Sequence, residues 1–117
     1  MTSVTADADA AVARQYRQGD VLVMRAEHPL AAPFRVRRDR EGRLVLAAGG
    51  PGGHAHVVDD PEAELFDDPL TGQRFLRLVT EAKLTHEEHD PIALPPGLYE
   101  VRRQRAYHPA ASPLVGD

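Results

Sequence analysis

Four histidines, arranged as two closely spaced pairs, are the residues of this sequence best suited to chemistry. The first pair is His54-Ala55-His56, and the second is His86-Glu87-Glu88-His89. If His54 and His56 lie on a strand, their side chains project from the same face, because strand residues alternate between faces. Imidazole is neutral near neutral pH and is a good ligand for zinc, iron, nickel or copper. The first pair therefore predicts two ligands for one ion.

The second pair supplies two more candidate ligands in either backbone geometry. In a helical turn His86 and His89 share a face, whereas in an extended segment His86 and Glu88 do. Pro91 disfavours a helix at the residue before it, which favours a strand that ends in a turn. Three or four histidines, with Glu88 as a further oxygen ligand, match a mononuclear metal site. We therefore predict a metal site whose ligands are His54, His56, His86 and His89.

Three functions are compatible with such a histidine cluster. In the first, a divalent transition metal (zinc, with iron, nickel or manganese as alternatives) serves a hydrolase, and Glu87 or Glu88 takes a proton from a water that the metal acidifies. In the second, paired histidines act without metal as general base and general acid in the cleavage or processing of RNA. In the third, a non-enzymatic binding or assembly module uses the histidines to hold loops or an interface, which leaves a homo-oligomer open.

The C-terminal part of the chain carries side chains that a small-molecule or RNA substrate could contact. Arg103 and Arg105 fall on one face of an expected strand and could hold a phosphate. Tyr99 and Tyr107 could stack on bases. The alternative interpretation places Tyr99 in the core and makes the arginines a solvated edge. The sequence alone does not choose between the two.

Composition narrows the class of protein. The chain has 117 residues, of which 42% are apolar and 27% charged, as expected for one globular domain. There is no cysteine, so disulfides, cysteine zinc sites and thiol nucleophiles are excluded. The net charge of −4 does not favour nucleic acid over the whole surface. Neither a secretory signal nor an apolar run of membrane-spanning length is present, so we expect a cytoplasmic protein with no membrane contact.

Short apolar runs separated by turn residues predict an all-β protein, either a small β-barrel or a β-sandwich. We expect a β domain over 17–108, a flexible or briefly helical N-terminus over 1–16, and a flexible tail over 109–117. The strongest hairpin signal joins residues 34–38 to 43–48 across a turn at 39–42. Further strands are expected near 21–24, 54–58, 73–79, 82–86 and 98–101.

Two stretches of sequence resemble a family of short bacterial and phage proteins of uncharacterised function. The first is Gly53-His54-Ala55-His56. The second runs from Leu84 to Tyr107 and contains His86-Glu87-Glu88-His89-Asp90-Pro91-Ile92 and Leu94-Pro95-Pro96-Gly97-Leu98-Tyr99. With Arg17-Gln18-Gly19-Asp20-Val21 at the start, the resemblance spans most of the folded chain. The His54–His56 pair is also loosely similar to cupins, whose small β-barrels hold a metal with such a pair, although the cupin acid and Pro-x-Gly spacings are not matched.

Overall fold

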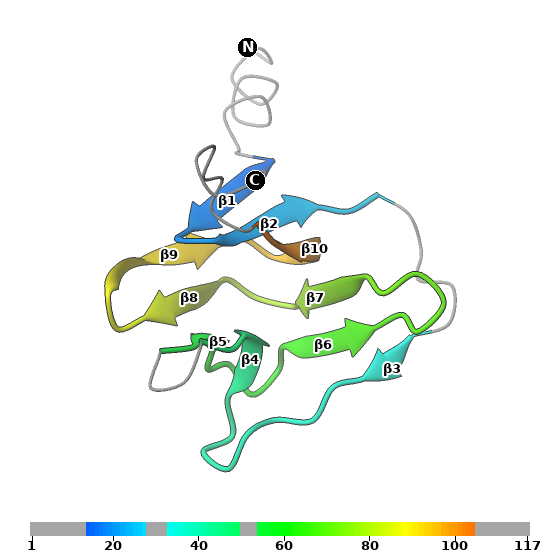
Figure 1. Cartoon of the computed structure of the whole chain (residues 1–117), viewed down its shortest axis with the longest axis horizontal. Coiled ribbons are helices and arrows are strands. Elements are labelled where there is room, and N and C mark those ends of the chain that lie inside the picture. The colour runs from blue at the N-terminus through cyan, green and yellow to red at the C-terminus, as the bar shows by residue number, and fades with distance from the viewer. Residues whose placement is uncertain (1–13, 28–32, 50–53, 105–117) are drawn as a thin grey trace, which may run out of the picture.

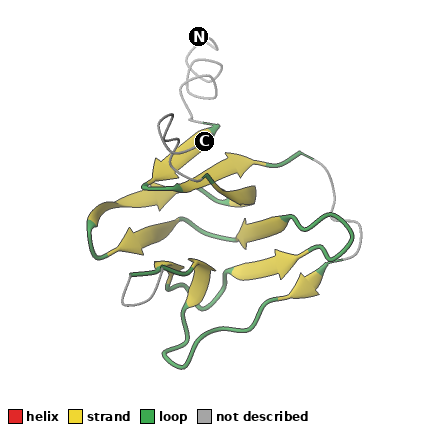
Figure 2. Ribbon diagram, viewed as in Figure 1, coloured by secondary structure: helices red, strands yellow, loops and turns green. Residues whose placement is uncertain are grey.

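The computed structural model describes residues 14–27, 33–49 and 54–104, and these form ten β-strands in two antiparallel sheets (Figure 1). The first sheet has the order β1 (Gln15–Gln18), β2 (Val21–Arg25), β10 (Gly97–Arg103), β7 (Arg74–Leu78), β6 (Glu64–Asp67) and β3 (Phe34–Arg35). The second has the order β4 (Leu44–Ala47), β5 (His56–Val58), β8 (Ala82–His86) and β9 (His89–Leu94). Within the described residues Figure 2 shows strands and loops without a helix. The all-β prediction is therefore confirmed, and the two sheets form a sandwich-like domain rather than a closed barrel.

The core lies between the sheets, and strand register determines which side chains reach it. Tyr99 of β10 pairs with Leu76 of β7, and Leu76 pairs with Leu65 of β6, so the three side chains follow one another across the inner face. Val58 and Leu84 are register partners in the second sheet. All five are fully buried, and burial of each such side chain contributes on the order of 2 kcal/mol.

The flexible or briefly helical segment expected over residues 1–16 is a strand in the part that the structure describes. Residues 15–17 belong to β1, which runs antiparallel to β2. Burial alternates along this strand: Gln18 is buried and Tyr16 half-buried, while Gln15 and Arg17 are exposed. That alternation of period two suits a strand and not a helix. Residues 1–13 and the tail after Gln104 lie outside the described residues.

The hairpin predicted between residues 34–38 and 43–48 is also wrong, because the two segments join different sheets. β3 pairs with β6, and the Val36 N–H donates to Leu65 O at 2.7 Å. β4 pairs with β5 instead. Arg38, next along the chain, also donates from its guanidinium to backbone carbonyls in the loop before β6. Those acceptors are Asp60, Pro61 and Ala63 at 2.7–3.2 Å. Arg38 thereby ties its segment to that loop, while the turn at 39–42 is kept by the bond from Asp39 N–H to Arg43 O at 2.9 Å.

The His86–His89 segment is a tight hairpin. β8 ends at His86, Glu87 and Glu88 form the turn, and β9 begins at His89. His86 and His89 are direct cross-strand partners. The sequence favoured a strand that ends in a turn before Pro91, and the turn is present, but a new strand, β9, continues through Pro91 to Leu94. The proline is tolerated because the ladder is irregular beside it and β9 is the last strand of its sheet.

Arg74 connects the two sheets from the inner face of β7. Its Nη1 donates to the carbonyls of Val45 and Leu46 in β4 at 3.2 Å each. Its Nε and Nη2 bind both oxygens of Asp67 at 2.6 and 2.8 Å. These hydrogen bonds to Arg74 hold the pKa of Asp67 below its ordinary value of 3.8. The arginine is therefore a charged crosslink whose partners come from both layers.

Arg74→Met is expected to lower the free energy of unfolding by about 2 kcal/mol, because it removes charge-assisted hydrogen bonds from a half-buried site. The matched control is Arg77→Met on the same strand, whose exposed pair with Glu64 contributes at most about 0.5 kcal/mol. Urea denaturation followed by circular dichroism measures both. Similar losses in the two variants would contradict the crosslink.

The same pair gives a pH dependence. Asp67 has a depressed pKa in the folded state, so its ionisation contributes stability above the ordinary value of 3.8 that is lost as the pH falls through the lowered folded value. The stability difference between the wild type and Asp67→Asn is therefore expected to shrink below pH 3.8. Denaturation curves at a series of pH values measure it, and a difference that does not change with pH would oppose this assignment.

Among the described residues there is no helix that is both long and apolar enough to cross a membrane.

Candidate functional site

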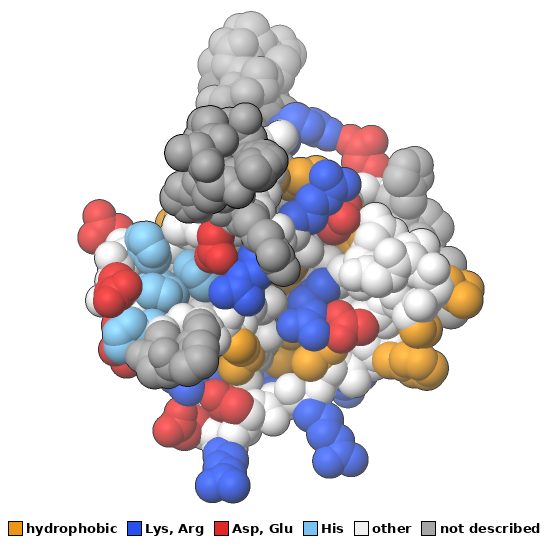
Figure 3. Space-filling model, viewed as in Figure 1, with side chains coloured by type: hydrophobic (Ala, Val, Ile, Leu, Met, Phe, Trp, Pro, Cys, Tyr) orange, Lys and Arg blue, Asp and Glu red, His pale blue; other side chains and the backbone are white. Residues whose placement is uncertain are grey.

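The structure brings the rings of His54, His56, His86 and His89 together at one edge of the domain, where acidic and basic side chains flank them (Figure 3). His86 lies at the centre of the group. Its ring centroid is 4.3 Å from that of His56, 4.6 Å from that of His89 and 5.8 Å from that of His54. The rings of His56 and His89 stack at 5.9 Å.

Three strands of the second sheet position these rings. β5 lies antiparallel to β8 with Val57 opposite Thr85, so His56 stands beside the end of β8 that carries His86. The β8–β9 hairpin places His89 directly across from His86. His54 comes just before β5 and so is not a strand residue. Sheet pairing therefore joins two histidine pairs that are distant in the sequence.

His56 is the buried member of the cluster, and Gln18 of β1 determines which of its nitrogens carries hydrogen. The Gln18 side-chain amide donates both hydrogens to backbone carbonyls, those of Leu84 at 3.0 Å and Asp90 at 2.9 Å. Its Oε1 is left as an acceptor 2.9 Å from His56 Nδ1. His56 Nδ1 must therefore carry a hydrogen, and in the neutral ring the Nε2 atom holds a lone pair.

The free nitrogen of His56 faces a carboxylate. Asp20 Oδ1 lies 3.3 Å from His56 Nε2, while Asp20 Oδ2 accepts a 2.8 Å hydrogen bond from Arg103 Nε. That bond lowers the pKa of Asp20. Burial is the main cause that lowers the pKa of His56, and the neighbouring His86 adds to it, against the opposing effect of Asp20. Both shifts favour an ionised Asp20 facing a neutral imidazole.

His54 and His86 are held by the hairpin turn. Glu87 Oε1 lies 2.8 Å from His54 Nδ1, and Glu88 Oε2 lies 3.6 Å from His54 Nε2. The Glu88 backbone N–H donates to His86 Nδ1 at 3.0 Å, so a neutral His86 carries its hydrogen on Nε2. His54, His86 and Glu87 also line a pocket of about 410 Å³, with Thr85 and Arg43 on its other walls.

Within residues 14–27, 33–49 and 54–104, no three His, Asp or Glu side chains are grouped so that they could hold one metal ion as they stand. The rings converge, but two of the four use a nitrogen in contacts with the turn.

Residues 17–104 match the family described as a domain of unknown function, DUF8820. The chain belongs to this family. No curated protein and no solved structure matches the chain. The likeness to cupins that the His54–His56 pair suggested thus has no support from these comparisons. The match does place the DUF8820 domain over all four clustered histidines and over the Gln18-Gly19-Asp20 turn.

Three residues of the DUF8820 site were missed by the sequence analysis, namely Gln18, Gly19 and Asp20. They entered that analysis only as part of the stretch that carries the family resemblance, with no role in the site. No local signal identifies them, because the burial of Gln18, unusual for a glutamine, is visible only in the folded structure. Gly19 adopts a φ of +60°, and a Cβ there would come within 2.7 Å of His89 Nε2. The turn therefore brings its backbone directly against the histidine cluster.

The residues predicted to bind substrate have different positions in the DUF8820 domain. Arg103 lies beside the cluster, bound to Asp20. Tyr99 is fully buried and its hydroxyl donates to Pro95 O at 2.6 Å, so the structure assigns it to the core rather than to a stacking surface. Arg105 and Tyr107 lie outside the described residues.

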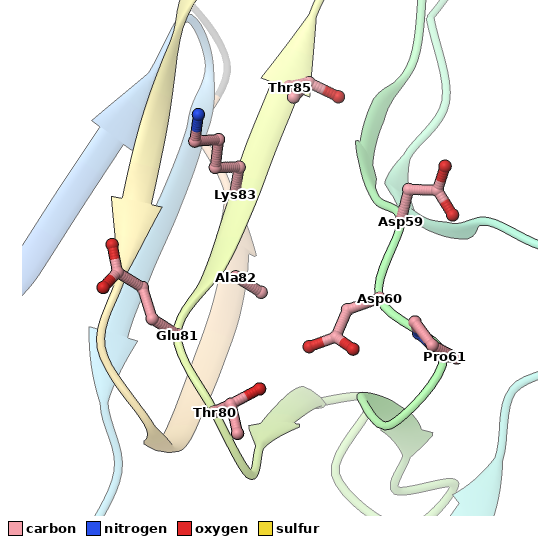
Figure 4. A pocket seen from close by; sticks show the side chains of 8 residues that line it. All are labelled: Asp59, Asp60, Pro61, Thr80, Glu81, Ala82, Lys83 and Thr85. Atoms are coloured by element: carbon pink, nitrogen blue, oxygen red, sulfur yellow. The ribbon is translucent and has the colours of Figure 1, made fainter.

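A second pocket, of about 530 Å³, lies between the loop before β6 and the start of β8 (Figure 4). Asp59 and Asp60 stand on one side, and Thr80 and Ala82 on the other. Its histidine-free lining distinguishes it from the pocket beside His54 and His86.

Proposed function

We propose that the histidine cluster binds a divalent transition metal, with zinc preferred and iron, nickel or manganese as alternatives. The observation that carries the proposal is the convergence of three imidazoles on that of His86, among which His56 has its Nδ1 bound by Gln18 and its Nε2 left available. Two imidazoles that bind one ion through nitrogens at about 2.0–2.1 Å have ring centroids roughly 4.5–5.5 Å apart. The separations of His86 from His56 and His89 are close to this range.

Metal binding requires small side-chain rearrangements at the rim of the cluster. His86 would exchange its hydrogen bond from the Glu88 N–H for the metal, and His54 would leave Glu87. Both contacts are partly exposed, and a hydrogen bond of this kind contributes only about 1 kcal/mol net to the stability of the protein. Apparent free energies of structural zinc binding are on the order of 10 kcal/mol, which is enough to offset both losses.

A metal-dependent hydrolase is the activity that this centre would suit. A bound ion of this class brings the pKa of a coordinated water toward neutrality. Glu87 and Glu88 lie on the exposed turn next to His54, where a carboxylate could take the proton. The adjoining pocket offers space for a small substrate beside His54 and His86.

Metal analysis of protein purified without a histidine tag tests the proposal. We expect about one equivalent of metal per chain after incubation with zinc and desalting, and a rise in melting temperature on zinc addition. Mass spectrometry of the eluted metal and calorimetric titration measure this. Less than about a tenth of an equivalent for zinc, iron, nickel and manganese alike would overturn it.

A metal-independent acid–base centre is the second candidate, favoured by the opposite protonation of two neighbouring rings. The neutral forms of His56 and His86 carry hydrogen on Nδ1 and on Nε2, respectively, so one Nε2 can accept a proton while the other donates one. Arg103 is a nearby cation for a phosphate. This candidate predicts cleavage of RNA that persists in EDTA and is lost in His86→Ala. Cleavage that stops with the chelator would contradict it.

A further inference from the structure

We infer that two residues of the Gln18-Gly19-Asp20 turn belong to the metal centre. Asp20 is a carboxylate ligand, and Gln18 is a positioning residue that selects which nitrogen of His56 binds the metal. The part concerning Asp20 rests on the proposed metal site. The role of Gln18 in fixing the hydrogen on His56 applies to the metal-free protein and does not depend on the metal site.

The case for Gln18 begins with its burial and its complete set of partners. Gln18 is 2% exposed, and its amide nitrogen and oxygen bond three groups of the second sheet. A flipped amide would set Oε1 against the carbonyl oxygens of Leu84 and Asp90, where both N–H donors would be lost. Leaving buried polar groups unpaired costs about 1–3 kcal/mol each. The amide is therefore held in one orientation, and that orientation keeps hydrogen on His56 Nδ1.

This is the arrangement that metal-binding histidines generally have, since the nitrogen that does not bind metal donates to an oxygen and thereby fixes the ring and its tautomer. Here the oxygen belongs to Gln18, and the free nitrogen, His56 Nε2, faces the Asp20 carboxylate.

The case for Asp20 is electrostatic. In a neutral His56 the Nε2 lone pair and the Asp20 Oδ1 lone pairs face each other at 3.3 Å, so the pair is attractive only with a cation or a proton between them. Two ligands of one tetrahedral ion stand roughly 3.4 Å apart when each lies about 2.1 Å from it. Asp20 Oδ2 is held by Arg103, as ligating carboxylates usually are held by a hydrogen bond.

Gly19 brings His89 close to the same turn. The absence of a side chain lets His89 Nε2 lie against the turn, because a Cβ would approach it to 2.7 Å. His56 and Asp20 are therefore candidate ligands beside this turn, and His89, an exposed residue, is a candidate third ligand against the same turn. A set of two imidazoles and one carboxylate suits zinc or iron rather than a soft cation such as copper(I).

The positioning role is tested on the metal-free wild type by ¹⁵N NMR of the histidine rings at a pH where His56 is neutral. We expect His56 to show a protonated Nδ1 and an unprotonated Nε2. In Gln18→Met, which keeps the side-chain length without the amide, the two tautomers should mix. A wild-type His56 with hydrogen on Nε2 would overturn the positioning role whatever the fate of the variant.

The ligand role is tested by titrating zinc into the wild type, Asp20→Asn and a control, Asp59→Asn, which lies in the other pocket. We expect Asp20→Asn to weaken zinc binding by at least about 10-fold and Asp59→Asn to leave it unchanged. Wild-type affinity in Asp20→Asn would remove Asp20 from the ligand set while leaving the metal site intact. No zinc binding by the wild type would overturn both the proposed function and the ligand role, and the NMR result would still decide the role of Gln18.

Discussion

His56→Ala is expected to weaken zinc binding by more than about 100-fold, because losing a ligand should cost more than the roughly 10–100-fold typical of losing a group that orients one. His56 is the buried ring of the cluster, with Nδ1 bound by Gln18 and Nε2 facing the Asp20 carboxylate at 3.3 Å. Calorimetric titration of zinc into the purified variant measures the change.

The same substitution has a cost to folding that must be separated from the loss of metal. It leaves Gln18 Oε1 without its partner in a buried position, which destabilises the protein by about 1–3 kcal/mol. Denaturation in EDTA gives this cost, and His86→Ala, which removes a half-buried ring, serves as a comparison with a smaller expected loss of stability. Lys83→Ala, an exposed residue of β8, is the control for both measurements. Zinc affinity that stays at the wild-type level in His56→Ala would exclude His56 as a ligand.

Tyr99→Ala is expected to have the largest effect on stability, about 3–5 kcal/mol. The ring is fully buried at the centre of the first sheet, in edge-to-face contact with Tyr16 at 6.2 Å and beneath the guanidinium of Arg25 at 5.3 Å. The substitution creates a cavity and removes the hydrogen bond from the hydroxyl to Pro95 O. A loss of this size is a large share of the stability of a typical domain.

Urea denaturation followed by far-ultraviolet circular dichroism measures the loss, and Tyr99→Phe separates the ring from its hydroxyl. We expect about 1 kcal/mol for Tyr99→Phe and at most about 0.5 kcal/mol for Val79→Ala, a control at an exposed apolar position. If Tyr99 instead bound substrate through its ring face, Tyr99→Ala would reduce activity at little cost to stability, and that outcome would count against its place in the core.

The strands were predictable where burial follows a simple alternation. Residues 21–24, 82–86 and 98–101 are strands in the structure, and each carries buried apolar side chains that alternate or run together as a buried strand requires. The pairing of these strands was harder to predict. The 34–38 segment has a turn after it and a strand beyond the turn, yet β3 pairs with β6 and Arg38 binds carbonyls of the loop before β6, more than 20 residues further along the chain.

The site could be predicted only in part, because some of its contacts, like the strand pairing, join segments that are distant in the sequence. Spacing identified the four histidines, because residue type and local repetition are visible along a single segment. It could not identify Gln18 or Asp20, whose roles depend on contacts with His56, 38 residues from Gln18 in the sequence. Nor did it distinguish a helical turn from a hairpin at His86–His89, since Pro91 argues against a helix but does not specify a reversal of the chain.

The hydrogen bonds of Gln18 have a consequence for local unfolding. An end strand of a sheet ordinarily frays at little free-energy cost, independently of the rest of a domain. Here, opening β1 would break the bonds of the Gln18 side-chain amide to β5, β8 and β9 together. The backbone N–H groups of β1 should therefore exchange with solvent deuterium only when the histidine cluster itself opens. An ion held at the centre would then slow that exchange, and the protection of the N-terminal strand would report how much of the protein is loaded.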